Sequence, residues 1–176
     1  SMAMTINDPL ILDAAGEKIV TGAADLSLNG GISATSGTLS STGGTLGLPI
    51  GGTLANGASF STSNTTLNLG GLLDVADTWS GSNTTSISLT TDNASLSSTA
   101  GLSLASLQTN GHDFKLASAT TDLTIENAFA LSGSETLSTQ GADLIFESSA
   151  DISSGSTLDA SGGGKLEFQQ GGTDNG

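Results

Sequence analysis

Residues 102–168 decide the fold, and they read LSLASLQTNGHDFKLASATTDLTIENAFALSGSETLSTQGADLIFESSADISSGSTLDASGGGKLEF. In this stretch a pair of apolar residues, separated by one other residue, recurs at steps of 21, 21 and 22 residues: Leu102/Leu104, Leu123/Ile125, Leu144/Phe146 and Leu166/Phe168. Because side chains alternate along a strand, each doublet points both apolar side chains to one side of the chain. Recurrence at a fixed period predicts a solenoid in which each repeat forms one coil.

Two further apolar columns share this period, so each coil is expected to hold three short strands. One column contains single leucines and the other contains mixed apolar residues: Leu96, Leu116, Leu137 and Leu158 in the first; Leu107, Phe129/Leu131 and Ala150/Ile152 in the second. Parallel strands joined by crossovers are right-handed in almost every known case. The predicted fold is therefore an all-β, right-handed, three-faced parallel β-helix with about eight coils of roughly 21 residues.

The three columns are expected to continue toward the N-terminus. The doublet column is extended through Ile87/Leu89, Leu67/Leu69, Leu46/Leu48 and Leu26/Leu28, the Leu96 column through Trp79, Phe60 and Leu39, and the Leu107 column through Leu73/Val75, Leu54 and Ile32. We interpret residues 1–176 as a single β-helix segment of a longer protein. Within it we expect an irregular first coil at 1–25, regular coils at 26–168 and a frayed tail at 169–176.

The composition excludes several classes of function. The formal net charge is −14, with three Lys and no Arg, so a nucleic-acid partner is not expected, because phosphate binding depends on clustered basic residues. No apolar run approaches the length of a membrane span, so this segment is not expected to insert into a membrane. The chain has no Cys, and repeat proteins do not need disulfide bonds for stability.

His112 is the one histidine of the chain, and Asp113 follows it directly. Such a residue is a candidate metal ligand or general base. A single His without a second cluster of ligands makes neither a zinc site nor a nucleophilic triad. The surrounding Asn110-Gly111 turn therefore favours interpretation of His112 as a corner residue.

Two columns of carboxylates are candidate Ca²⁺ ligands. Asp122 and Asp143 occupy equivalent positions in adjacent coils, and Glu126 and Glu147 form a second such pair. Calcium prefers several oxygen ligands, and it would relieve the repulsion between stacked carboxylates. A paired acid and base is a further alternative, whereas a solvated outer wall is the simplest interpretation. No cofactor other than Ca²⁺ is expected.

Asp74, Asp77 and Trp79 form a candidate carbohydrate-binding site. This is the one place in the sequence where a Trp and carboxylates meet, and such a combination binds sugars by ring stacking and by hydrogen bonds to hydroxyl groups. The alternative is that Trp79 fills a wide part of the core.

The Gly-, Ser-, Thr- and Asn-rich coils of about 20 residues, acidic and free of Cys, resemble the β-helical shafts of large bacterial surface proteins. The chain is similar in this respect to filamentous haemagglutinin-type adhesins and autotransporter passengers. The segment from Leu107 to Leu116 is similar to the strand-corner-strand units common in their shafts. The resemblance covers roughly residues 20 to 170.

This resemblance implies an extracellular rod module at the bacterial cell surface, with a role in adhesion, biofilm or spacing, and no catalysis. Its implied partners are a host or matrix surface, glycans, and other domains of the same long chain. The alternative is a carbohydrate-active enzyme, or a carbohydrate- or Ca²⁺-binding module, of the pectin-lyase-like β-helix type. Against the enzyme, the chain has no Arg and no compact Asp cluster.

Overall fold

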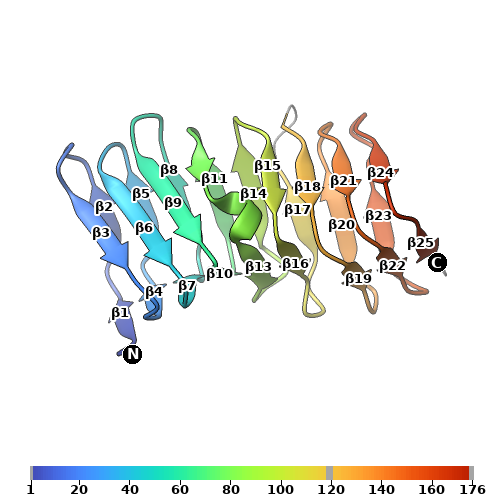
Figure 1. Cartoon of the computed structure of the whole chain (residues 1–176), viewed down its shortest axis with the longest axis horizontal. Helices are drawn as coiled ribbons and strands as arrows, with labels where there is room; N and C mark the ends of the chain where they lie inside the picture. Colours follow the sequence, from blue (N-terminus) through green and yellow to red (C-terminus); the bar gives the residue numbers. More distant parts are fainter. Residues whose placement is uncertain (1, 118–120, 175–176) are drawn as a thin grey trace.

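The computed structural model describes residues 2–117 and 121–174, and these residues wind into a three-faced parallel β-solenoid of about eight turns. The coils follow one another along the long axis of the molecule, so the two termini lie at opposite ends (Figure 1). Every strand pairing in the described part of the chain is parallel and joins one coil to the next. The predicted all-β solenoid is therefore confirmed.

Each complete coil contributes one strand to each of three faces, which we call A, B and C in the order of the chain. Face B is one continuous sheet. Its eight strands are hydrogen-bonded in the order of the coils: β2 (Leu10–Leu12), β5 (Ile32–Ala34), β8 (Gly52–Leu54), β11 (Leu72–Val75), β14 (Ser95–Ser98), β17 (Phe114–Leu116), β20 (Thr136–Thr139) and β23 (Thr157–Asp159). The continuity of this sheet fixes all the coils to one axis.

Face A holds the strands that precede those of face B. Its first sheet contains β1 (Met4–Ile6), β4 (Leu26–Leu28), β7 (Thr45–Leu48), β10 (Thr66–Leu69), β13 (Ser86–Leu89) and β16 (Ser106–Gln108). A second sheet continues the face with β19 (Phe129–Leu131), β22 (Ala150–Ile152) and β25 (Gly172–Asp174). Strands β16 and β19 lie in contact where the two sheets meet.

Face C completes each coil and also consists of two sheets. The first contains β3 (Lys18–Thr21), β6 (Thr38–Thr42), β9 (Ser59–Ser63) and β12 (Trp79–Ser80), and the second contains β15 (Leu102–Leu104), β18 (Leu123–Ile125), β21 (Leu144–Phe146) and β24 (Leu166–Phe168). The short 3₁₀ helix η1 (Ser82–Thr84) follows β12 and packs against β15.

The core is a central axis filled by the inward side chains of all three faces. Along most strands buried residues alternate with residues that are at least partly exposed, as the two-residue period requires. Leucines supply most of the core, and the aromatic residues Phe60, Trp79, Phe114, Phe129 and Phe146 are also buried in it. The rings of Phe129 and Phe146 stack at 5.1 Å between centroids, and Phe146 stacks on Phe168 at the same distance.

Corners between the faces depend on residues that adopt positive φ. Gly81 has φ 78°, and a Cβ atom at this position would overlap the carbonyl oxygen of Thr62 in the preceding coil. Asn110 adopts φ 54° in the turn between β16 and β17. Gly and Asn tolerate this conformation far better than other residues. These corners therefore keep successive coils in register.

The downstream doublets pair as the sequence predicts. Leu123 is aligned with Leu102 on one side and with Leu144 on the other, and Leu166 is aligned with Leu144. The predicted alignment of Leu116 with Leu137 is wrong by two residues. Phe114 is aligned with Leu137, while Leu116 is aligned with Thr139. Both apolar residues of β17 point inward, so a shift of two residues preserves the buried side.

The predicted extension of each column toward the N-terminus is wrong, because the upstream residues lie on a different face from the downstream residues of the same column. The doublets from Leu26/Leu28 to Ile87/Leu89 lie on face A and lead to Leu107, whereas the doublets from Leu102 onward lie on face C. Leu73, and not Trp79, is aligned with Leu96. Trp79 is aligned with Phe60, so it precedes the downstream doublets along face C. Because all three faces repeat with the same period, the period alone does not indicate which face a given apolar residue belongs to.

Candidate functional site

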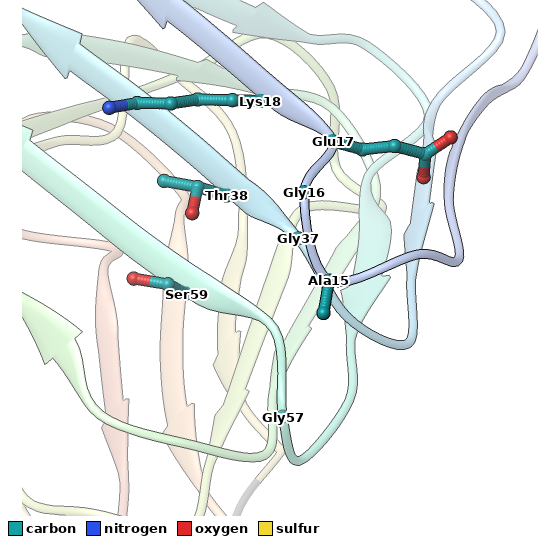
Figure 2. Close-up of a pocket in the computed structure, with 8 residues that line it drawn as sticks. All are labelled: Ala15, Gly16, Glu17, Lys18, Gly37, Thr38, Gly57 and Ser59. Atoms are coloured by element: carbon teal, nitrogen blue, oxygen red, sulfur yellow. The ribbon is translucent and has the colours of Figure 1, made fainter.

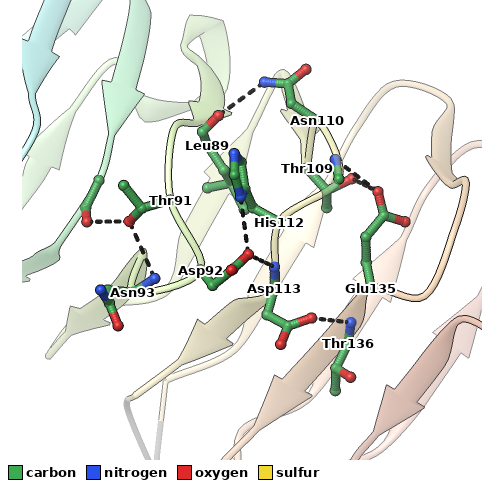
Figure 3. Close-up of polar contacts among 12 residues, drawn as sticks. Leu89, Thr91, Asp92, Asn93, Thr109, Asn110, His112, Asp113, Glu135 and Thr136 are labelled. Carbon is green, nitrogen blue, oxygen red and sulfur yellow. Dashed lines mark hydrogen bonds and ion pairs between the residues drawn. The ribbon is translucent and has the colours of Figure 1, made fainter.

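A network of polar contacts lies at the corner between faces A and B, where the turn after β16 meets the neighbouring coils (Figure 3). Nδ1 of His112 lies 2.9 Å from Oδ1 of Asp92, which belongs to the preceding coil. The same Oδ1 atom accepts the backbone N–H of Asp113 at 3.4 Å. The hydrogen bond from His112, followed by the one from Asp113, lowers the pKa of Asp92 below its ordinary value of 3.8.

Asp113 continues the chain of contacts into the next coil. Its Oδ1 atom accepts the backbone N–H of Thr136 at 2.6 Å. Asp92, Asp113 and Thr136 thus form a ladder in which a carboxylate of one coil binds the backbone of the next (Figure 3). A carboxylate is a strong acceptor for a backbone N–H, and here it bridges coils at a corner.

Glu135 is the most deeply buried carboxylate of this corner, with 2% of its surface exposed. Its Oε1 atom accepts the hydroxyl of Thr109 at 3.1 Å and the N–H of Gly111 at 2.9 Å. Its Oε2 atom accepts the N–H of Ser132 at 2.8 Å. Three donors from two coils therefore compensate the burial of this carboxyl group. The burial of Glu135 is not predictable from the sequence, because Gly133-Ser134-Glu135 has no pattern that indicates a buried residue.

The contacts of this corner join one part of the chain to another. The ring of His112 is partly accessible, with 32% of its side chain exposed, and its partner Asp92 is 72% exposed. The contacts of His112, Asp113 and Glu135 bridge neighbouring coils or close the turn itself. This agrees with the interpretation of His112 as a corner residue.

The first pair of candidate Ca²⁺ ligands lies at another corner, immediately before β18 and β21. Oδ1 of Asp122 accepts the N–H of Asp143 at 2.9 Å, and Oδ1 of Asp143 accepts the N–H of Lys165 at 2.8 Å. The two carboxylates are therefore stacked as predicted, and each binds the backbone of the next coil. Asp25 makes the same contact with Thr45 at 2.8 Å.

The second pair of candidate ligands lies at the opposite end of the same strands. Glu126 accepts a hydrogen bond from the hydroxyl of Ser103 at 2.5 Å, and Glu147 is exposed. A strand of three residues separates Glu126 from Asp122, which corresponds to about 13 Å at the usual rise per residue. Residues 2–117 and 121–174 contain no group of three or more acidic, His or Cys residues arranged to hold a metal ion. The Ca²⁺ role of these residues stays a prediction.

The structure separates the three residues of the candidate sugar site. Trp79 is 4% exposed, stacks on Phe60 at 4.8 Å between centroids, and donates Nε1–H to Oγ1 of Thr62 at 2.7 Å. Asp74 lies on the outer side of β11, and Asp77 accepts the N–H of Thr78 at 2.7 Å. The indole ring therefore lies inside the core and is not accessible for stacking on a sugar.

A depression of about 360 Å³ lies on the outer side of face C near the N-terminal end (Figure 2). Lys18, Thr38 and Ser59 are aligned in adjacent strands and line one side of it. Glu17 also lines it, but its Oε2 atom accepts the N–H groups of Asp13 and Ala14, at 2.7 and 3.0 Å. In Figure 2 the side chains of Glu17 and Lys18 point in opposite directions, so they do not converge on one ligand.

Comparison with known protein families, curated proteins and solved structures finds no significant match to this chain. Within the described residues, no helix is long and apolar enough to cross a membrane.

Proposed function

We propose that this chain is a rigid rod module of a secreted bacterial surface protein, with a spacing or adhesive role. The observation that carries the proposal is the continuous eight-stranded sheet of face B, which joins the first coil to the last. Backbone hydrogen bonds between all neighbouring coils resist both bending and extension along the axis. Such a rod holds whatever lies at one end at a fixed distance from the other end.

The outer walls support weak, repeated contacts with a polar surface. On face A the outward positions of the upstream coils hold hydroxyl groups in register, one coil apart: Thr45, Thr66, Ser86 and Ser106. Hydroxyl groups both donate and accept hydrogen bonds, as the hydroxyls of glycans do. Many weak contacts in a fixed array bind through multivalency rather than through one deep site. The adhesive version of the proposal depends on this wall.

Surface labelling of the producing bacterium tests the proposal. An antibody against the purified chain is applied to intact cells and to permeabilised cells. The proposal expects labelling of intact cells, because the module lies outside the cell. Labelling that requires permeabilisation would overturn it.

Arrays of glycans and matrix proteins then separate the adhesive role from the spacing role. An adhesive module binds when it is presented at high density on beads and binds weakly as a free chain. A pure spacer binds under neither condition. Release of sugar fragments from a polysaccharide would instead support the pectin-lyase-like alternative and contradict the rod proposal.

A further inference from the structure

Breaks in the sheets of faces A and C fall along one oblique line around the solenoid, near the middle of its length (Figure 1). On face C, β12 and β15 occupy successive coils but are not neighbours in one hydrogen-bonded sheet, and on face A the same holds for β16 and β19. Face B continues between these breaks through β14 and β17. We call the line that separates β12 from β15, β14 from β17 and β16 from β19 the seam.

Face B stays paired across the seam, and its pairing is shortest there. Strands β14 and β17 are aligned at two residue pairs, Ser95 with Lys115 and Leu96 with Leu116, whereas the other neighbours on face B are aligned at three or four pairs. The backbone nitrogen of Lys115 lies 3.4 Å from the carbonyl oxygen of Ala94, which is longer than a typical backbone hydrogen bond. Within the described chain, strand pairing is therefore weakest at the seam on all three faces.

The seam divides the solenoid into two blocks. The upstream block contains the strands from β1 to β14 together with β16, and the downstream block contains β15 and the strands from β17 onward. Ala105 alone joins β15 to β16. Its N–H donates to the carbonyl of Thr85 in the upstream block at 2.9 Å, and its carbonyl accepts the N–H of Asn127 in the downstream block at 3.0 Å. Ala105 is therefore bonded to both blocks.

On face C the short helix η1 lies against β15 in place of a paired strand. The N–H groups of Thr84 and Thr85 bond to the carbonyls of Gly81 and Ser82 in the same turn, at 3.1 and 2.9 Å. These donors are therefore not available to β15, and packing joins the two elements. Packing contacts are non-directional, so they tolerate a small rotation better than a hydrogen-bonded ladder does.

The buried carboxyl group of Glu135 links the two blocks at the corner between faces A and B. Glu135 precedes β20 of the downstream block, and its Oε1 atom accepts the hydroxyl of Thr109 and the N–H of Gly111, in the turn that directly follows β16. These bonds lie beside the break between β16 and β19. A side chain with rotatable bonds therefore connects the blocks where face A has no ladder.

We propose that the seam is a hinge at which the two blocks rock relative to each other about face B. The breaks in faces A and C open and close, and the bonds of Glu135 limit the opening. Within each block neighbouring strands are paired on every face, so each block moves as a rigid body. A few residues at the seam absorb the change, as in other hinge motions. The chain is then a rod that is stiff on either side of one defined place of bending. This inference rests on the breaks in the sheets and not on a role at the cell surface.

Pairs of spin labels on the outer side of the strands test the proposal, since the chain has no Cys of its own. The variant Ser40→Cys, Thr124→Cys places labels on β6 and β18 of face C, four coils apart and on opposite sides of the seam. The matched control, Ser27→Cys, Gln108→Cys, places labels on β4 and β16, four strand spacings apart in one continuous sheet of face A.

Both label pairs have a backbone separation of about 19 Å at the usual strand spacing. Pulsed electron paramagnetic resonance is expected to give a distance distribution that is about twice as broad for the pair across the seam as for the control pair. Equal widths for the two pairs would overturn the hinge. Neither pair changes a residue that links the blocks, so both variants are expected to fold.

Substitution of Glu135 then tests the link across the seam. Labels in the variant Ser27→Cys, Ala130→Cys lie on face A on either side of the break. Addition of Glu135→Ala is expected to broaden their distance distribution further, and Glu135→Gln, which keeps one acceptor oxygen, to broaden it less. Glu147→Ala removes an exposed carboxylate and is expected to leave the width unchanged. An unchanged width in Glu135→Ala would contradict the role of this residue in the hinge.

Discussion

Oδ1 of Asp122 accepts the backbone N–H of Asp143 at 2.9 Å, so a carboxylate of one coil holds the backbone of the next. Three other aspartates, Asp25, Asp113 and Asp143, make equivalent contacts at 2.6–2.8 Å. Four of the 17 acidic residues of the chain therefore join neighbouring coils at corners. The stacked carboxylates repel one another, but each gains a backbone donor that compensates for this repulsion.

Substitution of Asp122 separates the role of the acceptor from that of the charge. Asp122→Ala removes the acceptor and is expected to lower the free energy of unfolding by about 1 kcal/mol, because the side chain is exposed. Asp122→Asn keeps an oxygen acceptor and is expected to retain most of the stability. Denaturant midpoints measure both effects, with the exposed-site variant Glu147→Ala as the control. Equal loss in Asp122→Asn and Asp122→Ala would contradict the acceptor role.

The calcium hypothesis makes a separate prediction for the same corner. If Asp122 and Asp143 bind Ca²⁺, millimolar Ca²⁺ raises the melting temperature of the natural chain and not that of the variant Asp122→Asn, Asp143→Asn. A shift of the same size in both proteins would assign the effect to other carboxylates. The measurement is a thermal melt with Ca²⁺ and with a chelator.

Trp79 is a core residue that is held by a chain of buried and partly buried hydrogen bonds. Its Nε1–H reaches Thr62, whose hydroxyl lies 2.6 Å from that of Thr85, and Thr85 donates to the carbonyl of Gly81. Trp79→Phe keeps an aromatic ring but removes the donor, so we expect a loss of about 1–2 kcal/mol in stability. Chemical denaturation measures the loss. Thr62→Val removes the same bond from the other side together with the bond to Thr85, so its loss of stability is expected to be at least as large.

Fluorescence gives an independent check, since Trp79 is the one Trp of the chain. Emission of the folded protein is expected at the short wavelength of a buried indole, with little quenching by iodide. Emission at the wavelength of free tryptophan would show an exposed ring and would revive the carbohydrate-binding hypothesis.

Glu135 is expected to be the most sensitive acidic residue of the described chain. Glu135→Ala leaves the Thr109 hydroxyl and the N–H groups of Gly111 and Ser132 without their acceptor, at a cost of about 3 kcal/mol. Glu135→Gln keeps one acceptor oxygen and is expected to cost about half as much. Hydrogen exchange should quicken at the amides of Gly111 and Ser132. Unchanged exchange at both amides would rule out this role.

The pair of Asp92 and His112 predicts a pH effect with a defined sign. The pKa of Asp92 is lowered in the folded state, mainly by the hydrogen bond from His112. The contribution of this group to stability is therefore present above its ordinary pKa of 3.8 and is lost as the pH falls through the lower, folded value. In His112→Ala the pKa of Asp92 is expected to rise toward 3.8, as an NMR titration of the carboxyl group can measure.

Asp159 supplies the control within the same titration. Its pKa is also lowered, but the cause is hydrogen bonding with Ser161, and not with His112. His112→Ala should therefore leave the pKa of Asp159 unchanged. A parallel rise at both carboxyl groups would point to a general change in charge instead of the contact at Asp92.

The sequence predicts the coils well because an apolar doublet with a fixed step has few structural explanations. Leu123, Leu144 and Leu166 align as their spacing indicates. The assignment of faces fails between Ile87 and Leu102, where the proposed column takes a step of only 15 residues. In the structure these residues lie on different faces, and a single residue, Ala105, joins β15 to β16. A step of 15 residues instead of about 21 therefore indicates that Ile87 and Leu102 belong to different faces.

The candidate sites were less predictable for a physical reason. Alternation indicates whether a strand residue points inward, but corner residues obey no such period. The sequence therefore places Asp122 beside Asp143 correctly and says nothing about the N–H groups that they bind. Burial of Glu135 depends on three donors from two coils, of which the nearest in sequence is Ser132. Such a contact becomes visible only when the coils are stacked.

A distance ruler along face B tests the central claim most directly. Spin labels at Ser33 and at Ser97 or Ser138 lie on the outer side of β5 and of strands three and five coils further on. At about 4.8 Å per coil, pulsed electron paramagnetic resonance should give backbone separations of about 14 and 24 Å, in proportion to the number of coils. Separations that do not grow with coil number, or that place Ser138 nearer to Ser33 than Ser97 is, would contradict a single parallel solenoid.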